Sequence, residues 1–197
     1  MPHLSHTHTA LSGPEALTIW GHPSAPPLIL DPLSQFITLL CPSSDTSIIR
    51  CWACVAGWDV RRSGQHPNGD HDEIGLLSSR EGDYGYRWDY TVRVKGLPRE
   101  VWDDEIDTEV LHGVRVLGLV DLLDEFAGHW VAFSGVQREG EMAEAVVWIL
   151  EKMLGQERAP QLRGWRVPHV VDERFWVPFL AKYPVSGPLF ELCGLGV

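Results

Sequence analysis

The chain has 197 residues, of which 44% are hydrophobic and 22% are charged, and this composition excludes a wholly disordered protein. Its 27 acidic and 16 basic side chains give a net charge of −11. Because phosphate backbones and anionic lipid surfaces repel such a protein, we expect no nucleic-acid or membrane partner, and we expect a basic protein or peptide, or a small apolar ligand, instead.

The first 27 residues are rich in Pro, Ser, Thr, His and Gly, a composition that disfavours long regular elements. We predict a flexible or loosely ordered tail over 1–27, with a short ordered piece at Ala16–Trp20, and a single domain over 28–197. The N-terminus has no basic segment followed by an apolar one, so no signal peptide is expected. These features predict a cytoplasmic protein whose four cysteines are reduced thiols.

Two different elements are predicted between residues 31 and 60. Asp31 followed by Pro32 is typical of a helix start, because aspartate caps a helix and proline fits its first position. The buried side of this helix would consist of Phe36, Ile37, Leu39 and Leu40. Thr46–Val60 is rich in β-branched and aromatic residues, which favours a strand, and Ile74–Leu77 is predicted as a second short strand after a polar loop.

The clearest pattern runs from Tyr84 to Val94. Every even-numbered residue in it is aromatic or aliphatic, and the odd-numbered residues are Gly, Arg, Asp, Thr and Arg. An alternation with a period of two is typical of a strand with one buried face and one exposed face. We therefore predict a strand whose even-numbered side chains face the interior.

The second half of the chain has helical spacing. Glu105–Phe126 places apolar residues three and four apart, although Gly113 and Gly118 weaken a helix there and a strand at Val114–Leu119 competes with it. Glu141–Leu154 is a stronger helix, with Gly155 at its end. A last helix is predicted after Asp172 as cap, limited to about two turns by Pro178.

Because strands dominate the first half and helices the second, the sequence predicts an α+β fold. We expect an antiparallel sheet from the N-terminal half, with helices from the C-terminal half packed on one of its faces.

Cys51-Trp52-Ala53-Cys54 has the spacing of redox and zinc-binding cysteine pairs. Positions three apart in a strand point to opposite faces, so in the predicted strand the two sulfurs could not meet. We therefore interpret the pair as two small buried side chains and predict no cofactor.

The segment from His66 to Glu73 holds the densest group of possible ligands and proton carriers. His71, oriented by Asp70 or Asp72, is the candidate general base. His66, His71 and Asp72 are the candidate metal ligands. A solvated acidic loop explains the same residues without any chemistry. His112, His129 and His169 are further histidines that sequence alone cannot bring together.

Tyr84, Tyr86, Trp88 and Tyr90 would lie on one face of the predicted strand and are the candidate ligand-binding residues. Two functions follow from these patterns. The first is a non-catalytic protein- or ligand-binding domain with an acidic, tryptophan-rich surface, because the chain has nine tryptophans and tryptophan is enriched at interaction hot spots. The alternative is a small enzyme with a pocket lined by Tyr84–Tyr90 and a histidine acid/base, with or without a metal ion.

Overall fold

The computed structural model describes residues 8–23, 35–62, 73–81, 87–135, 138–157 and 161–195. For residues 35–36, 59, 61–62, 73–81 and 87–91 the description covers the backbone alone. The chain divides into two compact units. The sheet unit comprises residues 1–19 and 27–116, and the helical unit comprises residues 20–26 and 117–197.

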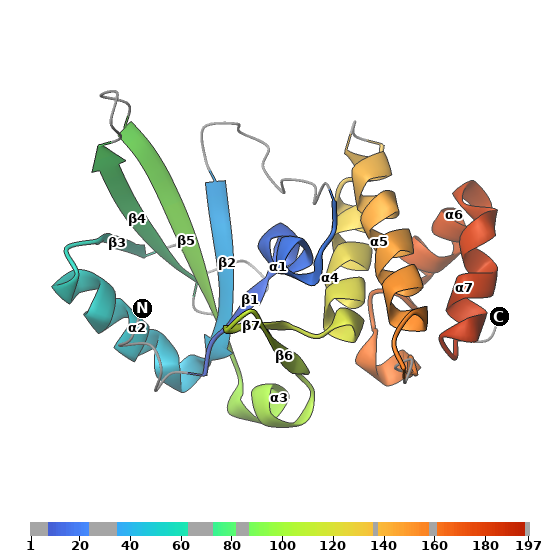
Figure 1. Ribbon diagram of the computed structural model, residues 1–197, viewed down its shortest axis with the longest axis horizontal. Helices are drawn as coiled ribbons and strands as arrows, with labels where there is room; N and C mark the ends of the chain where they lie inside the picture. Colours follow the sequence, from blue (N-terminus) through green and yellow to red (C-terminus); the bar gives the residue numbers. More distant parts are fainter. Residues whose placement is uncertain are drawn as a thin grey trace. The chain divides into compact units, whose positions relative to one another are not determined.

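The described residues of the sheet unit form a seven-stranded sheet in the order β3-β4-β5-β2-β1-β7-β6 (Figure 1). The strands are β1 Ala10–Ser12, β2 Gln35–Pro42, β3 Asp59–Arg62, β4 Glu73–Glu81, β5 Arg87–Leu97, β6 Thr108–Leu111 and β7 Val114–Leu117. The first half of the chain does supply most of the strands, and the fold is α+β, as predicted. The sheet is mixed, however, because β2 pairs in parallel with β5 and β1 with β7, so the prediction of a purely antiparallel sheet is wrong.

Strand β5 carries the alternation that the sequence predicts. Val92 and Val94 are 6% and 0% exposed, whereas Arg93 between them is exposed. Helix α2, Ser43–Val55, covers the apolar side through Ile49 and Ala53, which form a core cluster with Cys41, Val92 and Val94. The opposite side of β5 therefore carries Arg93.

Over residues 35–55 the predicted elements are wrong in type, whereas the end of the predicted strand, Asp59–Val60, does lie in a strand, β3. Gln35–Pro42 forms the central strand β2 rather than a helix, and Ser43–Val55 forms helix α2 rather than a strand. In β2, Leu40 and Cys41 are both buried, so apolar residues lie on both faces of the strand and the run shows no alternation. In α2, the buried Ile49 and Ala53 are four residues apart, which is the spacing of one helical face.

The helix predicted over Glu105–Phe126 is also wrong in its first half. Strands β6 and β7 are joined at His112-Gly113, and helix α4, Leu119–Ala132, begins after them. His112 and Gly113 have φ angles of 52° and 78°, the left-handed values that two-residue hairpin turns need. The competing prediction of a strand at Val114–Leu119 agrees better with the structure.

Ordered elements also occupy part of the segment predicted as a tail. Ala10–Ser12 form β1, and Gly13–Trp20 form helix α1, which includes the predicted ordered piece. Leu17 of α1 is fully buried, and Ala10 of β1 is 1% exposed. Residues 8–20 therefore belong to the packed structure.

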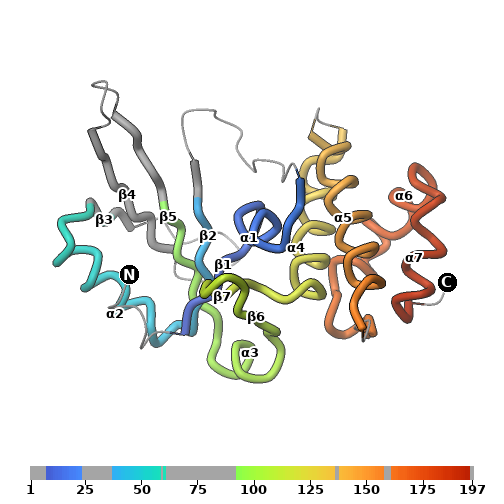
Figure 2. The backbone as a smooth tube through the Cα atoms, viewed as in Figure 1, coloured from blue at the N-terminus to red at the C-terminus, as the bar shows by residue number. Residues whose placement is uncertain are grey.

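The sheet unit also contains α3, Arg99–Asp104, and the described residues of the helical unit form α4, α5, α6 and α7 with two short 3-10 turns (Figure 2). The bounds are α5 Glu139–Leu154, η2 Gly164–Arg166, α6 Glu173–Lys182, η3 Pro184–Ser186 and α7 Gly187–Leu192. The predicted helices at 141–154 and after Asp172 are confirmed, and α6 continues through Pro178 beyond the predicted two turns. No helix within the described ranges is long and apolar enough to span a membrane.

Candidate functional site

Most of the sequence-predicted site residues lie where the structure gives no side chain. His66, Asp70, His71 and Asp72 lie outside the described residues, as do Tyr84 and Tyr86. Trp88 and Tyr90 lie in β5, where the backbone alone is described. Among the described residues, no three His, Cys, Asp or Glu side chains gather as metal ligands. The metal and acid/base roles of the His66–Glu73 segment, and the aromatic pocket, stay predictions.

A turn from strand to helix at Ser12–Glu15 begins the site that the structure does show. Gly13 joins β1 directly to α1 and has a φ angle of 72°, a left-handed conformation that costs other residues about 1–2 kcal/mol. The first backbone N–H groups of a helix have no acceptor within the helix, and its dipole places partial positive charge there. The start of α1 therefore stabilises negative charge; its first turn already carries the carboxylate of Glu15, and Pro14 has no N–H to donate.

Three polar residues stand in register across the strands next to this turn. Ser12 of β1 pairs with Thr38 of β2, and Thr38 pairs with Arg93 of β5. Directly opposite residues of neighbouring strands project from the same face, and neighbouring strands are about 5 Å apart. Ser12 is fully buried, Thr38 is half-buried and Arg93 is exposed. We call Ser12, Thr38 and Arg93 the polar row.

The polar row lies on the face of the sheet opposite to α2. The neighbours of Thr38 along β2, Ile37 and Leu39, pack with the apolar cluster under α2. Because side chains alternate along a strand, Thr38 projects to the other side, together with Arg93. Of the row, Thr38 and Arg93 reach the surface and offer a hydroxyl group and a guanidinium, donors that fit the oxygens of a phosphate, whereas the Ser12 side chain is buried beneath the surface.

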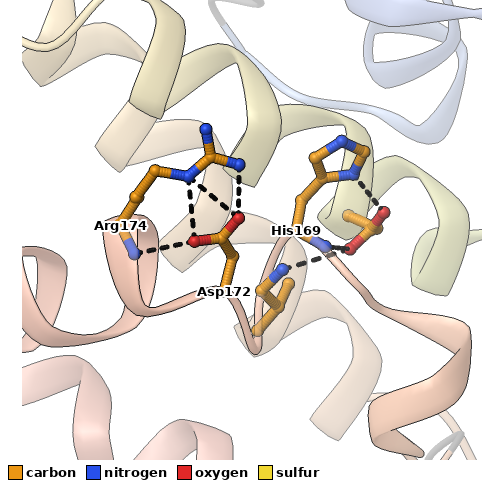
Figure 3. A network of polar contacts seen from close by, with 5 residues as sticks. His169, Asp172 and Arg174 are labelled. Carbon is orange, nitrogen blue, oxygen red and sulfur yellow. Dashed lines mark hydrogen bonds and ion pairs between the residues drawn. The ribbon is translucent and has the colours of Figure 1, made fainter.

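A second group of polar contacts lies within the helical unit, around His169 (Figure 3). The Nδ1–H of His169 donates to Oδ2 of Asp124 over 2.6 Å, and the backbone N–H groups of His169 and Val170 donate to Oδ1 over 2.7 and 3.1 Å. The Asp124 side chain is 13% exposed and the His169 side chain 58%. A carboxylate at Nδ1 fixes the tautomer in which Nε2 is the basic nitrogen, which is the arrangement of a histidine acid/base.

The same carboxylate also ties the segment before α6 to helix α4, since it accepts from two backbone N–H groups of that segment. The His169 ring lies against Gly128 of α4, where a Cβ atom would come within 3.1 Å of the ring. Helix α4 therefore holds the ring by a hydrogen bond and by a close approach that a glycine permits.

The cap of helix α6 completes this group. Asp172 accepts from the backbone N–H of Arg174 over 2.8 Å, as the sequence predicts for a helix cap, and from the Arg174 guanidinium over 2.6 Å (Figure 3). The guanidinium, the backbone N–H and the nearby His169 lower the pKa of Asp172 to about 2.

The lowered pKa predicts how the stability of an Asp172→Asn variant depends on pH. A carboxyl whose folded pKa lies below its ordinary value of 3.8 stabilises the fold above pH 4, and this contribution is lost as the pH falls towards 2. The variant should therefore melt below wild type at neutral pH, and the difference should close between about pH 4 and pH 2. Melting curves at several pH values measure this.

An Arg174→Gln variant is the matched control for this prediction, because it removes the guanidinium and keeps the carboxyl. It should lose part of the same stability, and adding Asp172→Asn to it should change less than in wild type. A gap between wild type and Asp172→Asn that stays constant down to pH 2 would contradict the assignment.

The sequence could have identified part of these sites. A glycine directly after a short apolar strand and before a helix is a signal for the β1–α1 turn, but Pro14 led to a tail being predicted instead. The polar row and the Asp124–His169 pair have no local signal, because their members are distant in sequence and come together only through strand register and helix packing.

The fold resembles solved structures at low sequence identity. An antigenic nucleotidyltransferase-like protein from Paracoccidioides brasiliensis matches with a TM-score of 0.58 and 9% identity, over 96% of this chain and 86% of that chain. JHP933 from Helicobacter pylori matches at 0.46 and 11%, over 95% and 71%. A second H. pylori protein, described as a nucleotidyltransferase, matches at 0.41 and 11%, over 97% and 88%. Family models and curated sequences give no match.

These findings correct the main functional prediction. The fold resembles that of a nucleotidyltransferase-like protein, which contradicts the prediction of a non-catalytic binding domain and supports its alternative, a small enzyme, better. The predicted tryptophan-rich surface rested on the number of tryptophans, but many of these side chains serve the core. Among those with a described side chain, Trp165 is exposed, whereas Trp20, Trp102 and Trp130 are buried. The predictions of partner and location stay predictions.

Proposed function

We propose that this protein is a nucleotidyltransferase, an enzyme that moves a nucleotidyl group from a nucleoside triphosphate to an acceptor. The observation that carries the proposal is the polar row beside the start of α1, in a chain whose fold resembles that of a nucleotidyltransferase-like protein. Fold likeness alone does not assign a reaction, so the argument depends on the chemistry of this face.

The donors of this face are suited to the phosphates of the nucleotide. The start of α1 offers backbone N–H groups, and Thr38 offers a hydroxyl group. Arg93 offers a planar guanidinium, which binds phosphate oxygens in pairs. In a chain with a net charge of −11, the Arg93 guanidinium provides one positive charge for a triphosphate, while Glu15 places a negative charge in the first turn of α1.

Phosphoryl and nucleotidyl transfer commonly use a divalent cation held by carboxylates. The polar row does not fit such an ion, because its side chains are two hydroxyl groups and a guanidinium, and β2 contains neither Asp nor Glu. The guanidinium of Arg93 would also repel a cation at this place. We therefore assign the row to the phosphates themselves and derive no step through a metal.

Nucleotide binding is the first test. Calorimetric titration with each of the four ribonucleoside triphosphates should show binding to wild type, and Arg93→Gln should weaken it by roughly tenfold or more, since a charge-assisted hydrogen bond contributes about 1.5–3 kcal/mol. Arg99→Gln is the matched control. Arg99 is an exposed arginine of the same unit, paired with Asp103, and its loss should leave binding unchanged.

Turnover is the second test. Wild type should release pyrophosphate from the bound triphosphate when mixed with pools of RNA, protein or small-molecule acceptors, and Arg93→Gln should release less at the same nucleotide concentration. Binding without pyrophosphate release from any pool would overturn the enzymatic proposal. Equal weakening by Arg93→Gln and Arg99→Gln would overturn the placement of the phosphates at the polar row.

A further inference from the structure

Helix α2 carries two exposed thiols on its outer side. Cys51 and Cys54 are both exposed and both free, and they lie three residues apart in the last turns of α2. The strand predicted from the sequence would have placed them on opposite faces, and that objection to a bridge disappears because the segment is a helix. The chain thus presents a pair of vicinal thiols to solvent.

Helix geometry places the two residues at a bridging distance. With a rise of 1.5 Å and a turn of 100° per residue, the Cα atoms of positions three apart are about 5 Å from each other. Disulfides span Cα separations of roughly 4.4–6.8 Å. The Cα separation in α2 therefore suits a Cys51–Cys54 disulfide. The Cβ atoms of such positions are about 5–6 Å apart, whereas a disulfide needs roughly 3.5–4.5 Å, so the last turn of α2 must tighten as the bridge forms.

The other two cysteines differ sharply from this pair. Cys41 and Cys193 are 0% and 1% exposed. Burial, together with the charge of Asp45, raises the pKa of the Cys41 thiol to about 12, and burial also raises the pKa of Cys193. Because the thiolate is the form that reacts, these two thiols are protected and serve as internal controls.

We propose that Cys51 and Cys54 form a redox modification site, which exchanges with a low-molecular-weight disulfide such as glutathione disulfide to give a disulfide within helix α2. One thiolate attacks the glutathione disulfide, forms a mixed disulfide and releases one glutathione. The second thiolate then attacks the protein sulfur of the mixed disulfide and releases the second glutathione. Two protein thiols are oxidised, glutathione disulfide is reduced to two glutathione thiols, and these carry away the two protons.

The packing of α2 allows this reaction without opening the core. The helix faces the sheet through Ile49 and Ala53, which are 1% and 0% exposed, whereas both sulfur-bearing side chains lie on the exposed side. A bridge would tie the last turn of α2, which ends at Val55. The site is independent of the proposed nucleotidyl transfer.

Thiol counting and mass spectrometry test the proposal on the full chain. In native wild type two thiols should react with a colorimetric disulfide reagent, and one should react in Cys51→Ser or Cys54→Ser. After equilibration with glutathione disulfide, wild type should be lighter by two hydrogen atoms and carry no glutathione. Each single variant should instead carry one glutathione. Trypsin should place the change in one peptide, because residues 51–61 follow Arg50 and end at Arg61.

A displaced pair provides the matched control. The double variant Cys54→Ser with Ala56→Cys keeps two exposed thiols but separates them by five residues, about 9 Å between Cα atoms, which is too far to bridge. It should carry two glutathiones. If wild type does the same, stays fully reduced, or forms disulfide-linked dimers on a non-reducing gel, the proposal is wrong.

Discussion

Replacing Val94 with aspartate is expected to lower the free energy of unfolding by roughly 3–5 kcal/mol, because it removes a buried apolar side chain and places a carboxyl in its position. Val94 is 0% exposed and packs with Val92, Cys41, Ile49 and Ala53 between β5 and α2. Natural domains are stable by only about 5–15 kcal/mol, so the variant should lose much of its native population. Urea unfolding followed by circular dichroism measures the change.

Val110→Asp is the matched control, since it makes the same substitution in another strand of the same unit. Val110 lies in β6 and is 64% exposed, so its replacement should change stability by no more than about 0.5 kcal/mol. If the two variants unfold at the same urea concentration, the even-numbered face of β5 is not the buried one, and the placement of Arg93 on the opposite face fails with it.

Replacing Phe179 with alanine should destabilise the helical unit by about 3–5 kcal/mol, the range for a fully buried phenylalanine. Phe179 stacks on Phe175 with ring centroids 4.5 Å apart and meets Trp130 edge to face at 5.3 Å. All three rings are at most 2% exposed. The variant therefore leaves a cavity and also removes aromatic pairs that contribute about 0.5–1.5 kcal/mol each.

Hydrogen exchange can locate this effect, because amides of α4 and α6 should exchange faster in Phe179→Ala. Val177→Ala, on the same helix but at a side chain that is 63% exposed, should leave those amides as protected as in wild type. Equal exchange in the two variants would show that Phe179 does not hold α6 against α4.

Local patterns predicted those elements whose stability is decided by one buried face. The alternation in β5, the helical stripe of α5 and the Asp172 cap of α6 each depend on neighbours within a few residues, and each appears in the structure. The sequence predicts a helix where β2 lies and a strand where α2 lies, because the packing of these two segments, and not their local pattern, decides their type. A central strand with apolar residues on both faces shows no alternation, and Ile48 and Ile49 in α2 are β-branched residues in a helix that the sheet stabilises.

The polar row cannot be predicted from local sequence, because it depends on which strands are neighbours in the sheet. Ser12, Thr38 and Arg93 are unremarkable in sequence, and they form a row only because β1, β2 and β5 are neighbours in a particular register. The His66–Glu73 segment is a candidate from the sequence because its polar residues are consecutive. Polar residues that are consecutive in sequence thus predict the His66–Glu73 candidate, whereas residues that are neighbours across the sheet form the polar row.

The pairing of β1 with β7 has a consequence for synthesis of the chain. Leu11 lies beside Val116, so one edge of β1 stays open on the ribosome until nearly all of the sheet unit has been made, although β2 can already cover the other edge. An open strand edge invites pairing with other chains, and contacts between distant residues form slowly. Translation pauses before residue 116 has left the ribosome should therefore increase aggregation of the nascent protein, whereas later pauses should have little effect.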